Sequence, residues 1–320
     1  MDNLTQGLTF RGIKIIGSHP VGSEWENYDT AKSGIDAADI IIINGEGSIH
    51  HNRPYAKQLL EVIPYAKAKG KKTALINALW EENSDEMAHN AAQADLIYVR
   101  DKYSQSALRK QLVNAVFAPD LTFYSNYPAL SIQNKTLGIS DSVSHKVSEQ
   151  CLNYAQLNKL HYLPITRPPS SQFDYRKDEK KFRKAQLYTL LLRFFGAWLP
   201  LRTYYKGLLY SYDRTDNYVT QLRNCRMVIA ARFHTACLCI QNRIPCVAIA
   251  SNSHKLEALF NDVELSPERV FSSLSEYEQL HESSKIDLLE WSAIEAQHIE
   301  SFIPMSHECL NAMFDEIAGL

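Results

Sequence analysis

The sequence predicts an α/β fold built from two doubly wound halves with a cleft between them. Apolar runs rich in β-branched residues alternate with segments of helical character, which is the pattern of parallel sheets covered by helices on both faces. The chain has 320 residues, about twice the usual size of a single domain. Each half is therefore long enough to bury a core of its own.

The first half contains the clearest strand, the run of four isoleucines at 40–43. A run without polar alternation is typical of a parallel strand that is covered on both faces. Gly70 follows a helical segment at the position of a C-terminal cap. We expect strands at 13–16, 39–44, 72–77, 96–99 and 115–118, and helices at 55–69, 84–93 and 102–112.

The segment 119–135 interrupts this alternation with Pro119, Pro128 and several turn-forming residues. We therefore expect a Rossmann-like N-terminal domain at 1–130 and a second Rossmann-like domain at 131–320. A proline inside the last helix, Pro304, predicts a kink or a restart there. In the second half we expect strands at 136–140, 161–164, 226–230 and 246–249, and helices at 147–157, 235–241, 253–260 and 287–315.

Composition excludes several classes of protein. The chain has 34 Lys and Arg residues against 36 Asp and Glu residues, a formal charge of −2, so nothing favours bulk attraction to nucleic acid. No apolar stretch reaches the roughly 18 to 20 residues of a spanning helix, and the N-terminus lacks a signal pattern. We expect a cytoplasmic protein whose six scattered cysteines are buried, reduced thiols.

The segment 175–212 combines a basic stretch with an aromatic and apolar one. Such a combination fits a helix at the inner face of a membrane, because cations attract anionic headgroups while Trp, Phe and Leu enter the interface. An ordinary amphipathic helix packed on its own domain, or an oligomer contact, explains the same pattern. The sequence leaves these alternatives open.

Basic residues follow several predicted strands, where ligands bind in open α/β sheets. Arg100 follows the strand at 96–99, and Arg232 and His234 follow the strand at 226–230. Ser253 and Lys255 follow the strand at 246–249, where a helix begins. Together with two helix N-termini, these side chains predict a receptor for phosphate or carboxylate. A structural role for the histidine, and a local Arg100–Asp101 ion pair, remain as alternatives.

A glycine-rich loop, Asn44–Ser48, follows the isoleucine strand. Its glycines permit close approach of a ligand to the backbone, or a tight turn. The Gly-x-Gly-x-x-Gly spacing of dinucleotide-binding folds is missing. His50 and His51 follow, but adjacent histidines rarely bind one ion well, so we expect no metal site.

With these motifs the chain resembles the polysaccharide pyruvyl transferase family. The resemblance rests on short collinear motifs between about residues 36 and 260, namely Asn44–Ser48, Val99–Asp101 with Ser104 and Leu108, Pro119–Phe123, Ala231–His234, Arg243–Val247 and Lys255. The sequence differs from the family pattern in two ways. It starts at Met1–Gly7 without the usual first strand and its Gly-Asn-x-Gly-Asp turn, and it has Phe233 in place of an aliphatic residue between Arg232 and His234, with Glu46 in the glycine loop.

The resemblance implies a GT-B-like fold, phosphoenolpyruvate as the donor substrate and no cofactor. The acceptor would be a sugar diol of a surface polysaccharide, such as exopolysaccharide or capsule, or of its lipid-linked precursor, and the product a pyruvate ketal. Arg232 and His234 match the catalytic positions. The implied donor-binding residues are Arg100, Arg232, His234, Ser253 and Lys255, and we expect the acceptor to meet Gly45, Glu46, Gly47, Ser48 and His50.

Two other functions remain open. A glycosyltransferase could use a nucleotide sugar on the same scaffold, with Glu257 as a candidate contact to the nucleoside, since fold does not fix function. A non-enzymatic subunit of an envelope-polysaccharide complex is the third alternative.

Overall fold

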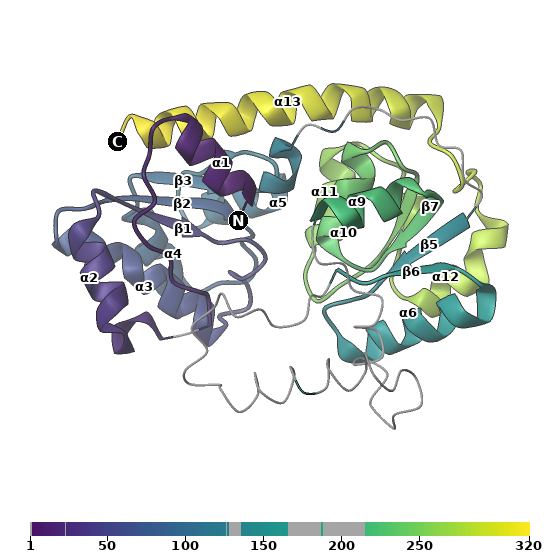
Figure 1. The fold of residues 1–320 in the computed structure, drawn as a ribbon, viewed down its shortest axis with the longest axis horizontal. Helices are drawn as coiled ribbons and strands as arrows, with labels where there is room; N and C mark the ends of the chain where they lie inside the picture. Colours follow the sequence, from purple (N-terminus) through teal and green to yellow (C-terminus); the bar gives the residue numbers. More distant parts are fainter. Residues whose placement is uncertain (1, 23, 126, 128–135, 166–186, 188–214) are drawn as a thin grey trace. The chain divides into compact units, whose positions relative to one another are not determined.

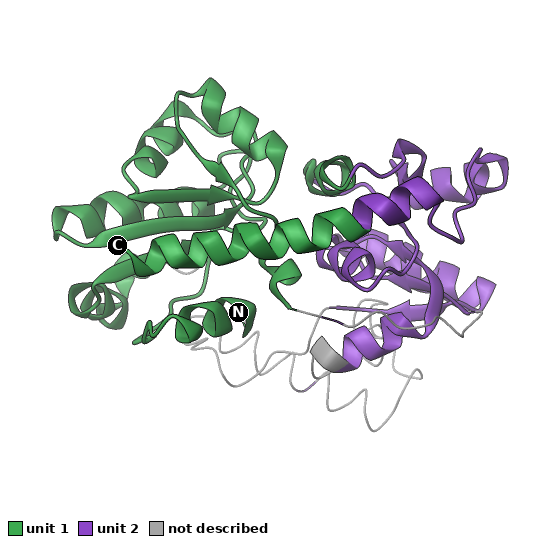
Figure 2. Ribbon diagram, turned by 90° about the horizontal axis from the view of Figure 1, so that it is seen from above, with its two compact units in different colours: residues 1–126, 253–263, 300–320 green, residues 127–252, 264–299 purple. Residues whose placement is uncertain are grey.

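The computed structural model describes residues 2–22, 24–125, 127, 136–165, 187 and 215–320. The chain forms two compact units, which Figure 2 shows in different colours. Unit 1 comprises Met1–Asn126, Ser253–Val263 and Glu300–Leu320, and unit 2 comprises Tyr127–Asn252 and Glu264–Ile299. Unit 1 is thus assembled from three separate stretches of sequence.

Unit 1 contains a four-stranded parallel sheet in the order β1-β2-β3-β4. Its core lies where α3 and α4 pack on the sheet through buried side chains such as Leu60, Ile63 and Met87. Figure 1 labels α3, α4 and the strands β1, β2 and β3. The strands are β1 (Ile40–Asn44), β2 (Lys72–Ala78), β3 (Leu96–Val99) and β4 (Val116–Phe117). The helices are α2 (Asp29–Ala37), α3 (Pro54–Ala68), α4 (Asp85–Ala92) and α5 (Lys102–Lys110), with short 3-10 helices at Trp25–Asn27 and Leu121–Tyr124.

Helices from both ends of the chain complete unit 1. They are α1 (Asp2–Phe10) and the later part of α13 (Ala293–Ala318). A methyl group on Gly7 would lie 2.3 Å from the ring of the buried Phe314, so the two helices pack tightly only because residue 7 is glycine. Arg11 adds an ion pair of 2.7 Å to Asp315. The middle stretch of unit 1, Ser253–Val263, carries α11 (Lys255–Asp262).

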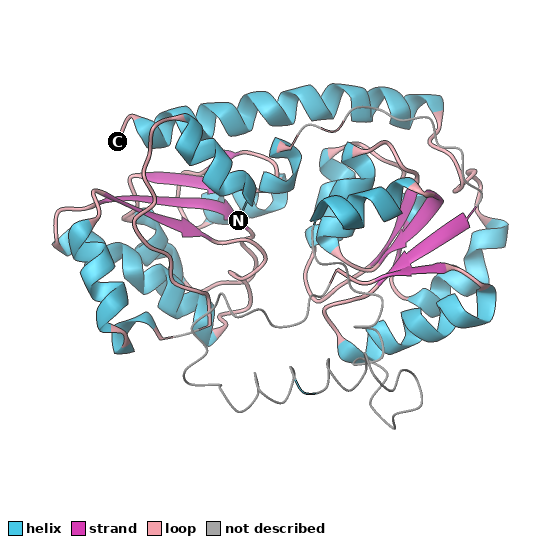
Figure 3. Cartoon of the chain, viewed as in Figure 1, coloured by secondary structure: helices cyan, strands magenta, loops and turns pink. Residues whose placement is uncertain are grey.

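Unit 2 contains a five-stranded parallel sheet in the order β6-β5-β7-β8-β9. Helices lie on both sides of this sheet (Figure 3), and residues of α6 and α12 form a core with β5, β7 and β8. The strands are β5 (Thr136–Ser140), β6 (His161–Leu163), β7 (Cys225–Ala230), β8 (Cys246–Ile249) and β9 (Val270–Phe271). The helices are α6 (His145–Asn158), α9 (Thr215–Arg223), α10 (Phe233–Gln241) and α12 (Leu274–Leu280), with 3-10 helices at Pro267–Arg269 and His281–Ser283.

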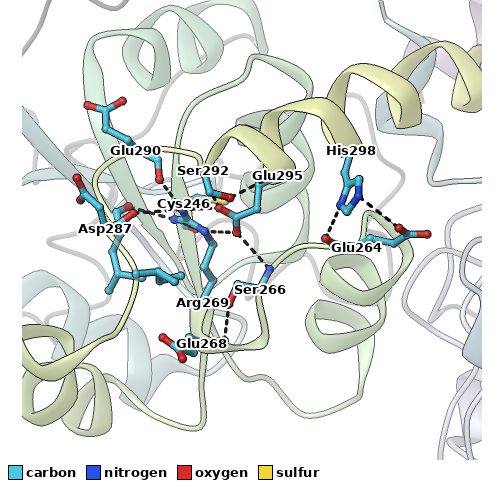
Figure 4. A network of polar contacts seen from close by, with 12 residues as sticks. Cys246, Glu264, Ser266, Glu268, Arg269, Asp287, Glu290, Ser292, Glu295 and His298 are labelled. Atoms are coloured by element: carbon cyan, nitrogen blue, oxygen red, sulfur yellow. Dashed lines mark hydrogen bonds and ion pairs between the residues drawn. The ribbon is translucent and has the colours of Figure 1, made fainter.

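A fully buried arginine, Arg269, organises the end of unit 2 where α13 begins (Figure 4). Its Nε donates to Oε1 of Glu295 at 2.7 Å and its Nη2 to Oε2 at 3.0 Å. The guanidinium also donates to the backbone carbonyls of Cys246, Asp287, Leu288 and Glu290. The buried charge is therefore paired and its donors are satisfied, as burial requires.

Most predicted strands are confirmed, and so is the parallel α/β class. The predicted strand at 13–16 is wrong, because this segment is irregular and Ile15 and Ile16 are 42 % and 53 % exposed. The last helix begins at Ala293 rather than 287 and continues without interruption through Pro304. The predicted restart is therefore wrong. A proline removes only its own backbone N–H from the helix, and the hydrogen bonds of the neighbouring turns hold the helix together.

Smaller predictions are also answered. Gly70 has the positive φ of 69° that a helix C-terminal cap requires. The six cysteines, all within the described ranges, are free thiols, and all but the partly exposed Cys309 are buried. The predicted break near residue 130 lies close to the unit boundary at 126/127, although α11 and the end of α13 belong to unit 1. Apart from Leu187, the segment 175–212 lies outside the described residues.

Candidate functional site

The glycine loop after β1 is shaped by contacts with the end of β2. A methyl group on Gly45 would lie 2.8 Å from Cβ of Ala78, so this close approach requires glycine. Glu46 adopts a left-handed backbone with φ of 41°, and its side chain accepts a hydrogen bond of 3.0 Å from Asn44. Asn77 donates to Asn44 in turn at 3.1 Å. The loop is held in one conformation against the carboxyl end of the sheet.

Arg100 extends from the end of β3 toward this loop. Its side chain is buried, and its Nη1 lies 3.4 Å from Oδ2 of Asp120, three residues beyond the end of β4. A methyl group on Gly47 would be 3.4 Å from Nη2 of Arg100. The guanidinium therefore lies directly against the glycine loop, and its partner is Asp120 rather than the Asp101 of the sequence alternative.

His50 lies at the same edge of the sheet and is buried. Burial, together with the positive charges of Arg53, His51, Lys255 and Arg100, lowers the pKa of His50 to about 4. The ring is therefore neutral at pH 7, and several cations surround it. Its Nδ1 lies 2.8 Å from Nδ1 of His51.

The start of α11 contributes three further polar side chains to unit 1. Ser253 and Lys255 are both buried, with 7 % and 8 % of their surface exposed, and Oγ of Ser253 has no hydrogen-bond partner among the described residues. Between them, His254 lies 3.2 Å from Oε1 of Glu81 through Nδ1 and 3.3 Å from Oδ1 of Asp101 through Nε2. Basic side chains and carboxylates therefore lie together at this edge, to which the start of α11 adds the positive end of a helix.

Three side chains at this edge could in principle hold a metal ion, since ligand atoms of His50, His51 and Glu81 lie within 4.8 Å of one another. Two observations oppose it. Besides burial, the nearby charges of Arg53, Lys255 and Arg100 lower the pKa of His50 and would repel a cation, and the Glu81 carboxylate already contacts His254. The edge therefore suits an anion better than a cation.

In unit 2 the predicted catalytic residues lie at the start of α10. Arg232 is the N-cap residue of α10, and its Nη2 lies 2.8 Å from Oδ2 of the buried Asp141. The second oxygen of Asp141 accepts a hydrogen bond of 2.9 Å from the backbone N–H of Ile165. His234 is half-buried in the first turn, with its ring 5.6 Å from that of Phe233. Asp141 thus fixes the arginine at the helix N-terminus.

The structure groups the predicted residues differently from their expected roles. Arg100 and Lys255, expected to bind the donor, lie in unit 1 with Gly47 and His50, expected to meet the acceptor. Arg232 and His234 lie in unit 2. The division into donor and acceptor residues stays a prediction.

Sequence reasoning missed several polar residues at these edges, namely Glu81, Asp120, Asp141 and His254. Asp120 and Asp141 directly follow strands or their extensions, so the strand-end rule that selected Arg100 could have found them. His254 stands beside Lys255 in the sequence, but its carboxylate partners are more than 150 residues away. No local pattern could have revealed them.

Comparison with known proteins agrees with this geometry. Residues 8–253 match the sequence profile of the polysaccharide pyruvyl transferase family. The chain, with its two parallel sheets and the basic residues at their strand ends, therefore belongs to that family. Among proteins with curated functions, none matches the sequence. No helix in the described part of the chain is long and apolar enough to cross a membrane.

One of the similar solved structures supports the GT-B-like fold class. A putative UDP-N-acetylglucosamine 2-epimerase from Listeria monocytogenes aligns with a TM-score of 0.52 at 11 % identity, over 97 % of this chain and 84 % of that one. Accessory secretory protein 1, 2 and 3 of Streptococcus pneumoniae aligns with a TM-score of 0.39 at 11 % identity, over 91 % and 57 %. The first similarity concerns the fold alone.

Proposed function

We propose that this polysaccharide pyruvyl transferase uses phosphoenolpyruvate as donor and forms a pyruvate ketal on a sugar diol. The observation that carries the proposal is that two basic side chains of unit 1, Arg100 after β3 and Lys255 at the start of α11, are buried. A small ligand with two anionic groups suits such a pair of cations. Phosphoenolpyruvate carries a phosphate and a carboxylate on three carbons.

The proposed reaction balances without a cofactor. The terminal carbon of the enol accepts a proton, and an oxygen of the first sugar hydroxyl bonds to the central carbon. The bond from that carbon to the phosphate oxygen breaks, and phosphate leaves with the electron pair. The second hydroxyl then attacks the same carbon, the hydroxyl protons are released, and the products are the ketal and inorganic phosphate.

We assign the steps to residues from their chemistry. Arg100, Lys255 and Ser253 would bind the anionic groups of the donor, because arginine offers a planar pair of donors and lysine a compact charge. Arg232, held by Asp141, would stabilise charge that develops on the leaving phosphate. His234 would transfer protons as general acid or base. The glycine loop Gly45–Ser48 and His50 would meet the sugar.

Ligand-dependent melting tests the proposal. Phosphoenolpyruvate should raise the melting temperature of the wild type, since a ligand at about 100 times its Kd stabilises the folded state by about 2.7 kcal/mol. Lys255→Met should lose this shift, whereas Lys146→Met, which removes an exposed lysine on α6, should keep it. Release of phosphate on addition of a sugar diol would establish the transfer itself.

The same experiment separates the alternative functions. Stabilisation by a nucleotide sugar and none by phosphoenolpyruvate would contradict the proposal and favour glycosyl transfer. Stabilisation by saccharide alone, without phosphate release, would favour a binding subunit. Three further points stay predictions from the sequence and the family: the acceptor, a cytoplasmic location, and membrane contact through 175–212.

A further inference from the structure

We propose that His254 is a positioning residue, which fixes the start of α11, and with it Lys255, at the sheet edge of unit 1 that carries Arg100. The inference rests on the proposed function for the identity of the anion. The described ion pairs of His254 are with Glu81 and Asp101 and not with the neighbouring Arg100 or His50. Its carboxylate partners, Glu81 and Asp101, come from the ends of β2 and β3.

The contacts of the His254 ring define its protonation state. Nδ1 lies 3.2 Å from Oε1 of Glu81, and Nε2 lies 3.3 Å from Oδ1 of Asp101. Ionised carboxylates only accept hydrogen bonds, so each ring nitrogen must carry a hydrogen for both contacts to be favourable. The geometry therefore selects the imidazolium form. The backbone N–H of His254 donates to the second oxygen of Glu81 at 3.3 Å.

The order of residues links this ion pair to the two cations. Asp101 directly follows Arg100, and Lys255 directly follows His254. The bond between His254 and Asp101 therefore lies one residue away from each cation. Breaking it would release the start of α11, and with it Lys255, from the strand end that carries Arg100.

The other end of α11 is attached at the same place. Oδ2 of Asp262 accepts a hydrogen bond of 3.1 Å from the backbone N–H of Lys102, the first residue of α5. The eight-residue helix α11 is thus held at both ends by the segment 100–102 and its neighbours. Loss of the His254 contacts would leave α11 attached through its last residue.

The charges around His254 determine how its attachment responds to pH. Facing groups are the carboxylates of Glu81, Asp101 and Asp262, the charge of Lys102 and the ring of Tyr103, 5.4 Å away. Burial opposes the charge on the ring, but the bonds to Asp101 and Glu81 outweigh burial and raise the pKa of His254. Its ion pairs are therefore complete below the ordinary pKa of about 6.5 and are lost as pH rises through the raised value.

Hydrogen exchange and donor binding test the inference with His254→Gln, whose amide can bond one carboxylate but carries no charge. The control is His89→Gln, an exposed position on α4. In the absence of ligand, amides of residues 256–262 should exchange faster in His254→Gln alone. The KM for phosphoenolpyruvate should rise about tenfold with kcat within a factor of two. As pH rises through the raised pKa of His254, the wild-type KM should rise, while that of His254→Gln stays flat.

Unchanged exchange in α11, or an unchanged KM and pH profile, would overturn the inference. Glu81→Gln keeps the histidine and serves if His254→Gln does not fold; it should reproduce the faster exchange. A wild type that does not respond to phosphoenolpyruvate would contradict the proposed function, and the exchange of ligand-free α11 would then decide the positioning role by itself.

Discussion

Nη2 of Arg232 lies 2.8 Å from Oδ2 of Asp141, an ion pair that joins the carboxyl ends of the neighbouring strands β7 and β5. Asp141 is buried, and its other oxygen accepts from the backbone of Ile165. The carboxylate is therefore fixed before it meets the guanidinium. The Asp141 carboxylate therefore fixes the direction of the Arg232 side chain through Nη2.

Asp141→Asn tests this orientation. The amide keeps an oxygen for the N–H of Ile165 but loses the charge that faces Arg232. We expect kcat/KM for pyruvyl transfer to fall about 10- to 100-fold, the effect of losing one hydrogen bond to a charged group. Steady-state kinetics with matched melting curves measure it. Full activity in a folded Asp141→Asn protein would show that Arg232 needs no such partner.

His234→Ala should abolish turnover while the fold is retained, because general acid–base catalysis contributes about 10²- to 10⁴-fold. The side chain is half-buried in the first turn of α10 and lies outside β7, so its removal should leave the sheet of unit 2 intact. Phosphate release is the readout, and the exposed His89→Ala is the control. Normal phosphate release from His234→Ala would remove the histidine from the reaction.

The two glycines of the loop after β1 should respond differently to alanine. In Gly45→Ala the new methyl group would lie 2.8 Å from Cβ and 2.9 Å from Cα of Ala78, and we expect a loss of about 1–3 kcal/mol in stability. In Gly47→Ala the nearest atom is Nη2 of Arg100 at 3.4 Å, so stability should change less. Urea unfolding compares the two, and equal losses would contradict the described packing.

The buried pair Arg269–Glu295 should make unit 2 sensitive to acid. Burial opposes the charge of Glu295, but hydrogen bonds from Arg269, Ser292 and Ser266 outweigh it and lower its pKa to about 2. The stabilisation is complete above the ordinary value of 4.5 and is lost as pH falls through about 2.

Glu295→Gln checks this prediction. Near pH 7 it should destabilise unit 2 by about 3–5 kcal/mol, because Arg269 stays buried without its counter-charge. Stability should also fall less between pH 4.5 and 2 than in the wild type. Glu290→Gln is the matched control, since that carboxylate forms an exposed pair with Arg226 worth under about 1 kcal/mol. An equal acid response in both variants would exclude Glu295 as the source.

The strands were predictable because a parallel strand that is buried on both faces has a continuous apolar sequence, as at Ile40–Ile43. α1 was not, since it packs against the distant segment Leu121–Tyr124 and against Phe314 near the end of the chain. The strand predicted at 13–16 was wrong because two of its β-branched residues, Ile15 and Ile16, stay exposed. Propensity cannot report contacts that depend on the tertiary fold.

For the candidate site, the strand-end rule selected Arg100 and Arg232 correctly as residues at carboxyl edges. It gave no partners, because the Asp120 contact depends on the order of strands in the sheet. The membership of α11 in unit 1 was also beyond the sequence. Its segment lies between two strands of unit 2, and only the tertiary contacts of His254 and Asp262 reveal where it packs.

The packing of Gly7 against Phe314 has a consequence for synthesis of the chain. A ribosome makes the sheet of unit 1 first, yet residues 300–320 emerge only after all of unit 2. Until then the surface that receives Phe302 and Phe314 stays uncovered and open to aggregation. A nascent chain that lacks residues 300–320 should therefore depend on chaperones, although it already contains the whole sequence of unit 2.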